Sequence, residues 1–422
     1  MNLSSIRENT ALAFATLATH KFRAALTILG VFIGVLVIVA MAAVLNGFRQ
    51  SVLDNAESFG TRNVYVWRYP FIMTSKPSAE ILNRKPLTLE DALAIQEDVP
   101  AVEYVYAGLP YAIPLPGEVP PLPPEVKYKD HAINRSQIIG NFPVAERVMN
   151  VPVNEGRYFN DAENLHRAYV CVLAFNVVEA LFPSEDPIGK VINVAGQDFT
   201  VVGTVKKLKA GPFGSENRED NDLFIPYWTF RKMFPSKDDH FIIIRMREGR
   251  MKEGIEGIER VLRLRRNVPI DRDNNFEIGT PDSFISTFDD IVGAVFGVMM
   301  IISSIAFLVG GVGVMNIMLV AVTERTREIG IRKAVGAKRS DIIWQFLTEA
   351  ITLTGLGGVA GLGFGWLMAV SVTALVPALA MKIPLWAAAI GFFGSVGVGL
   401  LFGLWPAMKA SRLDPIVALR YE

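Results

Sequence analysis

Four long apolar runs without a single charged side chain limit what this chain can fold into. A helix needs about 20 apolar residues to cross the hydrocarbon core of a bilayer, and each run reaches that length. The first run is too long for the core of a signal peptide and no clear cleavage site ends it, so we expect it to persist as a membrane span. The uncharged runs are residues 24–47, 291–322, 350–381 and 383–408.

Lysine and arginine gather at one side of these runs, which predicts their orientation. Basic clusters precede the first run, fill the segment between the second and third, and follow the fourth, whereas the loop between the third and fourth carries only Lys382. Cytoplasmic loops carry an excess of lysine and arginine. We therefore expect a protein of the bacterial inner membrane, with both termini in the cytoplasm and the segment between the first two spans on the outer side. The basic residues are Arg7, Lys21, Arg23, Arg325, Arg327, Arg332, Lys333, Lys338, Arg339, Lys409, Arg412 and Arg420.

The same patterns predict the domain organisation. We expect a cytoplasmic amphipathic segment over residues 1–23, an extracytoplasmic domain over 48–290, a short cytoplasmic helix over 323–341 and a cytoplasmic tail over 409–422. The second and third apolar runs exceed what a bilayer requires, and either tilting or protrusion as stalks would accommodate the excess. Transmembrane helices are expected at residues 24–47, 291–322, 342–381 and 383–408.

The outer segment begins and ends with the same succession of strand, helix and strand. Residues 63–67 have a strand-like pattern, Thr88 is a candidate N-cap for the following helix, and 102–106 return as a strand. Residues 241–244 and 276–278 are strand-like too, and they flank an apolar stripe with helical spacing. The fold class predicted is therefore four transmembrane helices plus an α+β domain, a ferredoxin-like module with a β-rich insertion over about residues 113–221.

Three features of the outer segment have structural explanations as good as functional ones. The proline-rich stretch from Pro114 to Pro124 suits a rigid recognition arm or a plain surface linker. The stretch from Gly211 to Asn221 has little apolar content and predicts a mobile loop, a common place for binding. The single cysteine, Cys171, lies in a strand pattern without neighbouring charge, which favours a buried and inert thiol.

Glycines recur at four-residue spacing in the spans, where they let helix backbones approach closely. We favour packing within one subunit over a dimer interface or a sliding surface. The uncharged runs contain no Asp, Glu, His or Arg for a proton relay or an ion pathway. The membrane part is therefore expected to act as a lever rather than a channel. The glycine ridges are Gly30 and Gly34; Gly293 and Gly297; Gly357, Gly361 and Gly365; Gly399 and Gly403.

Catalytic and cofactor motifs are missing from the sequence. No phosphate-binding loop is present, since Gly189 and Lys190 lack the upstream glycine and the following hydroxyl, so ATP hydrolysis is expected on another chain. No histidines pair at metal-ligand spacing, and a solvated helix boundary explains Asp289 and Asp290 better than a carboxylate dyad. We expect no enzyme activity, cofactor or metal in this chain. The formal net charge is zero and gives no reason to expect nucleic acid as a partner.

Several segments resemble MacB-type permeases of ABC transporters, which also contain the FtsX-like permease domain. Residues 311–337, GVGVMNIMLVAVTERTREIGIRKAVGA, resemble the long signature of that family, and residues 412–422, RLDPIVALRYE, resemble its C-terminus. EGRYF at 155–159 and DPIGK at 186–190 look like parts of its periplasmic core. On this resemblance, residues 291–415 together form the FtsX-like permease domain.

The resemblance implies a dimer of permeases, with a second copy or a homologous chain, working with ABC ATPase subunits that bind the ATP. It also implies mechanotransmission, in which ATP-driven closure at a short cytoplasmic helix is passed to the outer domains. That helix presents an apolar ridge rimmed by charged residues, and it also carries small residues. Such a surface fits a groove on a partner protein better than it fits a surface of anionic lipid. The ridge consists of Ile329, Ile331, Ala334 and Val335. We predict that Gly336 ends the helix and that the ATPase contacts are Glu324, Arg325, Glu328, Ile331 and Arg332.

The function expected is efflux, export or release of a substrate such as a drug, a peptide or a lipoprotein. A periplasmic adaptor and an outer-membrane channel are possible further partners, together with membrane lipid. The alternative is a membrane-anchored mechanotransducer or scaffold that regulates a cell-envelope partner without transport. A bare scaffold gives no role to the dense motif from Glu324 to Ala337, so we favour the transporter subunit.

Overall fold

The computed structural model describes residues 21–58, 61–70, 77–113, 121–134, 136–149, 151–208, 217–375 and 381–419. Most of the expected amphipathic segment at 1–23, residues 114–120 of the proline-rich stretch and residues 211–216 of the expected mobile loop lie outside these ranges. The chain forms two compact units, one of residues 1–51 and 288–422 and the other of residues 52–287.

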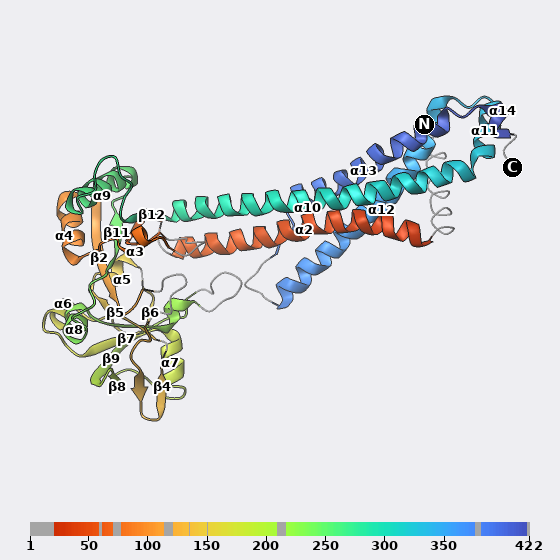
Figure 1. Ribbon diagram of the computed structural model, residues 1–422. Helices are drawn as coiled ribbons and strands as arrows, with labels where there is room; N and C mark the ends of the chain where they lie inside the picture. The colour runs from red at the N-terminus through yellow and green to blue at the C-terminus, as the bar shows by residue number, and fades with distance from the viewer. Residues whose placement is uncertain are drawn as a thin grey trace. The chain divides into compact units, whose positions relative to one another are not determined.

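The first unit, the membrane unit, is helical (Figure 1). Within the described residues, four of its helices are long and apolar enough to cross a membrane. α10 begins at Pro281, ahead of the expected residue 291, because Thr280 caps it by accepting a hydrogen bond from the Ser283 amide at 3.1 Å. The helices are α2 (Lys21–Ser58), α10 (Pro281–Glu324), α11 (Thr326–Ala334), α12 (Arg339–Leu375), α13 (Leu385–Ser411) and α14 (Pro415–Leu419).

Glycines set the close contacts among the membrane helices. A Cβ atom added to Gly30 would lie 2.8 Å from Gly310 Cα, so α2 and α10 touch backbone to backbone. A Cβ on Gly361 would lie 2.9 Å from the Phe32 carbonyl oxygen, and one on Gly403 would lie 2.6 Å from Ala350 Cβ. Three of the four glycine ridges thus pack within the chain, as favoured from sequence. The fourth, Gly293 and Gly297, has no described atom within 4 Å of an added Cβ.

The second unit, the outer unit, begins and ends with the ferredoxin-like module expected from sequence. Its strands lie in the order β12-β1-β11-β2, and each pairs antiparallel with its neighbour. Thr88 caps α4 through a capping box with Asp91, which confirms the predicted helix start. The elements are β1 (Asn63–Trp67), α3 (Ala79–Leu82), α4 (Leu89–Asp98), β2 (Val102–Pro110), β11 (Phe241–Met246), α9 (Met251–Arg265) and β12 (Glu277–Gly279).

The insertion between β2 and β11 extends the same sheet through a β2–β5 pairing. This part of the sheet is mixed: β10 runs parallel to β5 and β7 runs parallel to β9, whereas other pairs such as β8 and β9 are antiparallel. Its strands are β3 (Val126–Tyr128), β4 (His131–Ile133), β5 (Gln137–Asn141), β6 (Val153–Gly156), β7 (Val170–Leu173), β8 (Val191–Val194), β9 (Gln197–Val205) and β10 (Asp222–Pro226). Its helices are α5 (Ala145–Val148), α6 (Asp161–Leu165), α7 (Phe175–Leu181), η2 (Arg218–Asn221) and α8 (Tyr227–Met233).

Buried polar contacts fasten the insertion to the module. The Tyr106 hydroxyl on β2 donates to Asn141 Oδ1 on β5 at 2.5 Å, and Asn141 Nδ2 donates to the Tyr158 hydroxyl at 2.9 Å. His240 Nδ1 lies 3.0 Å from the Leu87 carbonyl oxygen, so this nitrogen carries the proton and the other ring nitrogen accepts from the Tyr227 hydroxyl at 3.0 Å.

The structure corrects one expectation and confirms another in the insertion. Residues 217–221 of the expected mobile loop are ordered, because the Asn217 side chain caps η2 and the buried Asp220 accepts from the Leu208 amide at 3.0 Å. The sequence pattern missed this because the stabilising contact is a long-range one. Cys171 is fully buried in β7, which confirms the predicted burial, and this burial raises the pKa of its thiol.

Candidate functional site

The short helix α11 joins α10 to α12 and carries most of the residues predicted to contact an ATPase. It is nine residues long and ends at Ala334, and Gly336 follows two residues later with a φ of +108°, in the left-handed region that glycine adopts without strain. The Gly336 amide donates to the Lys333 carbonyl at 3.1 Å and the Ala337 amide to the Arg332 carbonyl at 3.0 Å. This pair of bonds is a Schellman motif, which fixes the turn into α12.

One face of α11 is packed against the membrane unit. Thr326, Ile329 and Gly330 are buried, and Ile329 belongs to an apolar cluster with Ile342 and Phe346 of α12. A Cβ atom on Gly330 would lie 2.8 Å from Ala418 Cβ of α14, so only glycine permits this close approach. The predicted apolar ridge of α11 included Ile329, and that part of the interpretation is wrong, since helical geometry turns Ile329 to the inner face.

Charged side chains brace α11 to its neighbours within the chain. Arg325 Nη1 lies 3.3 Å from Glu349 Oε2 on α12, and the Glu349 side chain is only 4 % exposed. Lys333 Nζ donates to the Ser411 carbonyl at 2.9 Å and to the Leu413 carbonyl at 2.5 Å. Hydrogen bonds to charged groups contribute about 1.5–3 kcal/mol each, so these contacts fix the orientation of α11.

Arg332 is shared between two partners at the border of the packed face. Its guanidinium donates to Gln345 Oε1 on α12 and, at 2.5 Å, to Glu328 Oε1 one turn earlier on α11. Three basic residues of this segment thus bind partners within the chain: Arg325, Arg332 and Lys333. A role as free lipid anchors would require them to point away from it.

The other face of α11 carries exposed residues of mixed character. Ile331 is 45 % exposed and Val335 is 84 % exposed, and Arg327, Glu328 and Ala334 lie beside them on the same exposed face. Positions three and four apart share one side of a helix. The exposed face of α11 is therefore a small apolar patch bordered by one acidic and one basic residue.

The six residues predicted from sequence separate into two groups. Glu324, Glu328, Ile331 and Gly336 are exposed, whereas Arg325 and Arg332 are partly buried and paired with residues of α11 and α12. Sequence reasoning missed α14, where Ile416 and Val417 are 69 % and 63 % exposed beside α11. The sequence signal that could have predicted α14 is Asp414-Pro415, since proline is common at the first position of a helix. In the structure the Asp414 carboxylate accepts a hydrogen bond from the Ile416 amide at 2.8 Å at the start of this helix.

Within the described ranges, no group of three or more His, Cys, Asp or Glu side chains is placed to hold a metal ion. The site contains two ion pairs instead, Arg325 with Glu349 and Arg332 with Glu328.

The chain matches two protein-family descriptions. The first is the MacB-like periplasmic core domain over residues 24–259, more than half of the chain, and the second is the FtsX-like permease C-terminal domain over residues 300–415. Together they cover α11 and most of the outer unit and the spans, apart from residues 260–299.

Similar proteins agree with these matches. The chain is 34 % identical over 419 residues to the pyoverdine export ATP-binding/permease protein PvdT of Pseudomonas savastanoi pv. phaseolicola, covering 97 % of this chain and 59 % of that protein. It is 32 % identical over 424 residues to the macrolide export ATP-binding/permease protein MacB of Azoarcus sp., covering 100 % of this chain and 60 % of that protein. The chain thus spans about three fifths of the length of these relatives.

The periplasmic region of MacB from Actinobacillus actinomycetemcomitans aligns with 56 % of this chain and 97 % of its own, at 15 % identity and a TM-score of 0.43. The family matches and the four apolar helices make this a membrane protein with an extracytoplasmic domain. The chain belongs to the MacB-type family of FtsX-like ABC transporter permeases.

Proposed function

We propose that this permease couples ATP hydrolysis by an ABC ATPase to movement of its outer unit, and that this movement drives export or release of a substrate. The observation that carries the proposal is the division of α11 into a packed face and an exposed face. A helix that is braced on one side and presents an apolar patch bordered by charge on the other suits a groove on a second protein.

In this proposal Glu328 and Ile331 contact the ATPase directly, together with Glu324, and Val335 extends the same patch. Arg325 and Arg332 act differently, because they hold α11 against α12. A displacement of α11 by the ATPase would then be transmitted to the spans rather than lost in a flexible connection. Ile416 and Val417 of α14 widen the surface, since α14 packs on Gly330.

Transmission to the outer unit would run along α2 and α10, because the boundary between the two units falls inside these helices. Arg49 of α2 binds Asp289 of α10 through two hydrogen bonds, at 2.7 and 3.1 Å. The rings of Phe48 and Phe288 lie 4.7 Å apart beside this pair. The two helices are thus tied together near the boundary, which supports a lever.

A second permease copy is the partner we propose for α10. Its exposed residues include Ile301, Ile305 and Val309, which continue the line of the open glycines Gly293 and Gly297 at four-residue spacing. Small residues followed by branched apolar ones let two helices pack closely in lipid.

For cargo, we propose a drug, a peptide or a lipoprotein engaged by the outer unit, with an adaptor and an outer-membrane channel as further partners. The relatives named for pyoverdine and macrolide export support small-molecule export. A scaffold without transport remains the second candidate. Copurification of an ABC ATPase would favour the exporter, and its absence from an active envelope complex would favour the scaffold.

The proposed orientation places both termini and α11 in the cytoplasm. Ser340→Cys should react with a membrane-impermeant thiol reagent only after the cells are opened, since Ser340 is exposed near the start of α12. Cys171 is buried and should give no background. Ser215, outside the described residues, should react from outside as Ser215→Cys. Labelling of Ser340→Cys in intact cells would contradict the orientation.

The coupling surface is tested by Ile331→Asp and Glu328→Lys. Both variants should insert and dimerise, while ATPase binding, cargo-stimulated hydrolysis and transport fall together by about tenfold or more. Leu165→Asp is the matched control, because Leu165 is a highly exposed apolar residue of the outer unit. The measurements are a pull-down of the ATPase and its activity in reconstituted complexes. Normal binding and full transport in both variants would exclude α11 as the coupling element.

A further inference from the structure

The strand β12 is the last strand at one end of the outer sheet. It pairs with β1 through Glu277, Ile278 and Gly279, and no other strand of the described ranges pairs with its outer side. An unpaired strand edge presents main-chain donors and acceptors that can bind another strand.

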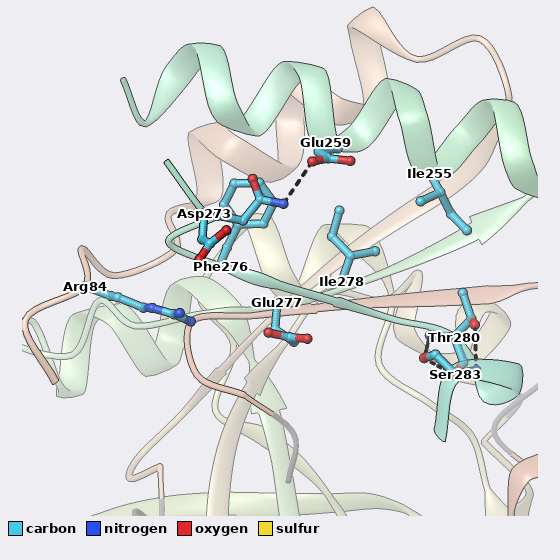
Figure 2. Close-up of a pocket in the computed structure, with 10 residues that line it drawn as sticks. Arg84, Ile255, Glu259, Asp273, Phe276, Glu277, Ile278, Thr280 and Ser283 are labelled. Atoms are coloured by element: carbon cyan, nitrogen blue, oxygen red, sulfur yellow. Dashed lines mark hydrogen bonds between the residues drawn. The ribbon is translucent and has the colours of Figure 1, made fainter. Parts of the chain in front are cut away.

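A groove of about 450 Å³ follows this edge. Figure 2 shows Ile278 pointing toward α9, where Ile255 borders the same space, and Glu277 on the opposite side of the strand. Successive side chains of a strand point to opposite faces, so a groove that touches both residues runs along the edge rather than over one face. It extends from Asp273 before the strand to Ser283 after it.

The charges of the groove are unbalanced. Its lining contains the carboxylates of Glu259, Asp273 and Glu277 but only one guanidinium, that of Arg84. Glu259 accepts a hydrogen bond from Asn274 Nδ2 at 3.0 Å and lies 4.0 Å from Arg263 Nη1, so the excess of negative charge lies at Asp273 and Glu277. Burial raises the pKa of Glu277, and the positive charge of Arg84 partly opposes that effect. An incoming cation would therefore be favoured beside Glu277.

A second hollow shares Glu259 with this groove and lies on the exposed end of α9. Its lining includes Leu264 and Ile270, both highly exposed apolar residues. The groove at β12 thus continues into an apolar surface that a longer partner segment would cover.

We propose that the outer edge of β12 binds an extended segment of a partner polypeptide as an added strand. Main-chain hydrogen bonds to β12 give the affinity in this mode, and the alternating side chains give the specificity. In the bound segment an apolar side chain faces Ile255 and Ile278, and the adjacent residue, on the opposite face, is a lysine or arginine that faces Glu277.

The probe is a capped, fluorescent heptapeptide, Thr-Val-Lys-Val-Lys-Val-Thr, added to the full-length protein in detergent. Two N-methylated isomers accompany it, one with methyl groups on the valine amides and the other on the lysine amides. Only one set of amides faces β12 in a paired strand. One isomer should retain binding in an anisotropy titration and the other should lose it. Equal binding of both isomers, or no binding of the parent peptide, would overturn the proposal.

The groove itself is tested by Glu277→Lys, which should weaken binding of the parent peptide by about tenfold or more. Glu248→Lys is the matched control, because Glu248 is exposed and does not line the groove. A thermal midpoint close to that of the wild type shows that each variant is folded. Equal weakening by both substitutions would show unspecific charge attraction and overturn the site. These outcomes are independent of ATPase coupling, since the peptide titration contains no ATPase.

Discussion

The membrane unit and the outer unit fill their interiors in opposite ways. The interior of the outer unit is built from large side chains, with Tyr106, Phe199 and Phe230 almost completely buried. In the membrane unit, backbones meet at glycines such as Gly30 and Gly310. Water drives apolar side chains together in the first case, whereas lipid gives helices no such incentive and close backbone contact must hold them. The outer unit should therefore be sensitive to truncation and the membrane unit to enlargement.

The largest expected effect is Phe230→Ala in the outer unit. Phe230 is fully buried, and its removal should cost about 3–5 kcal/mol of unfolding free energy, from lost transfer energy and a cavity. Phe393→Ala on α13, where the ring is 69 % exposed, should change little. Thermal unfolding of both purified variants checks the comparison. Similar losses in the two variants would show that the buried ring of Phe230 stabilises the outer unit no more than an exposed ring does.

The intermediate effect is Gly30→Ala in the membrane unit. The new Cβ would lie 2.8 Å from Gly310 Cα, and because backbone cannot move aside cheaply we expect a loss of about 1–3 kcal/mol. Gly363→Ala on α12 is the control, since its Cβ would meet no described atom within 4 Å and alanine favours the helix. Protease resistance in detergent measures both. A stable Gly30→Ala variant would refute backbone contact, and loss of dimer in Gly293→Ala would support the second copy at α10.

The smallest expected effect is a pH dependence in the outer unit. Burial lowers the pKa of His240, while the Leu87 carbonyl and Asp238 oppose this shift. The folded protein thus binds a proton at His240 less readily than the unfolded chain does. The contribution of neutral His240 to the free energy of unfolding is therefore present above about pH 6.5 and is lost as the pH falls below that value.

Comparison of wild type with His240→Gln isolates this contribution. Burial also raises the pKa of Glu219 and of Asp222, which act in the opposite sense, but they titrate in both proteins and cancel in the difference. The gap in thermal midpoint between the two proteins should narrow between about pH 7 and pH 5. A gap that stays constant over this range would exclude His240 as the titrating group.

Much of the architecture followed from the sequence because its signals are local or periodic. Uncharged runs of membrane length located four helices, and capping at Thr88 and the alternation at 63–67 located elements of the module. The order of strands and helices around the insertion sufficed to predict a ferredoxin-like sheet, since few ways of connecting such elements are favourable. The residues at 311–337 likewise identified the family.

The tertiary structure alone decided which surfaces remain free. Sequence placed Ile329 and Ile331 in one ridge, but packing against α12 buries the first and exposes the second. Arg325 was predicted to contact an ATPase, and the structure pairs it with Glu349, a partner distant in sequence. The open edge of β12 depends on where the sheet ends. A residue's neighbours along the chain determine its element, whereas its burial and its partners depend on long-range contacts that no local pattern encodes.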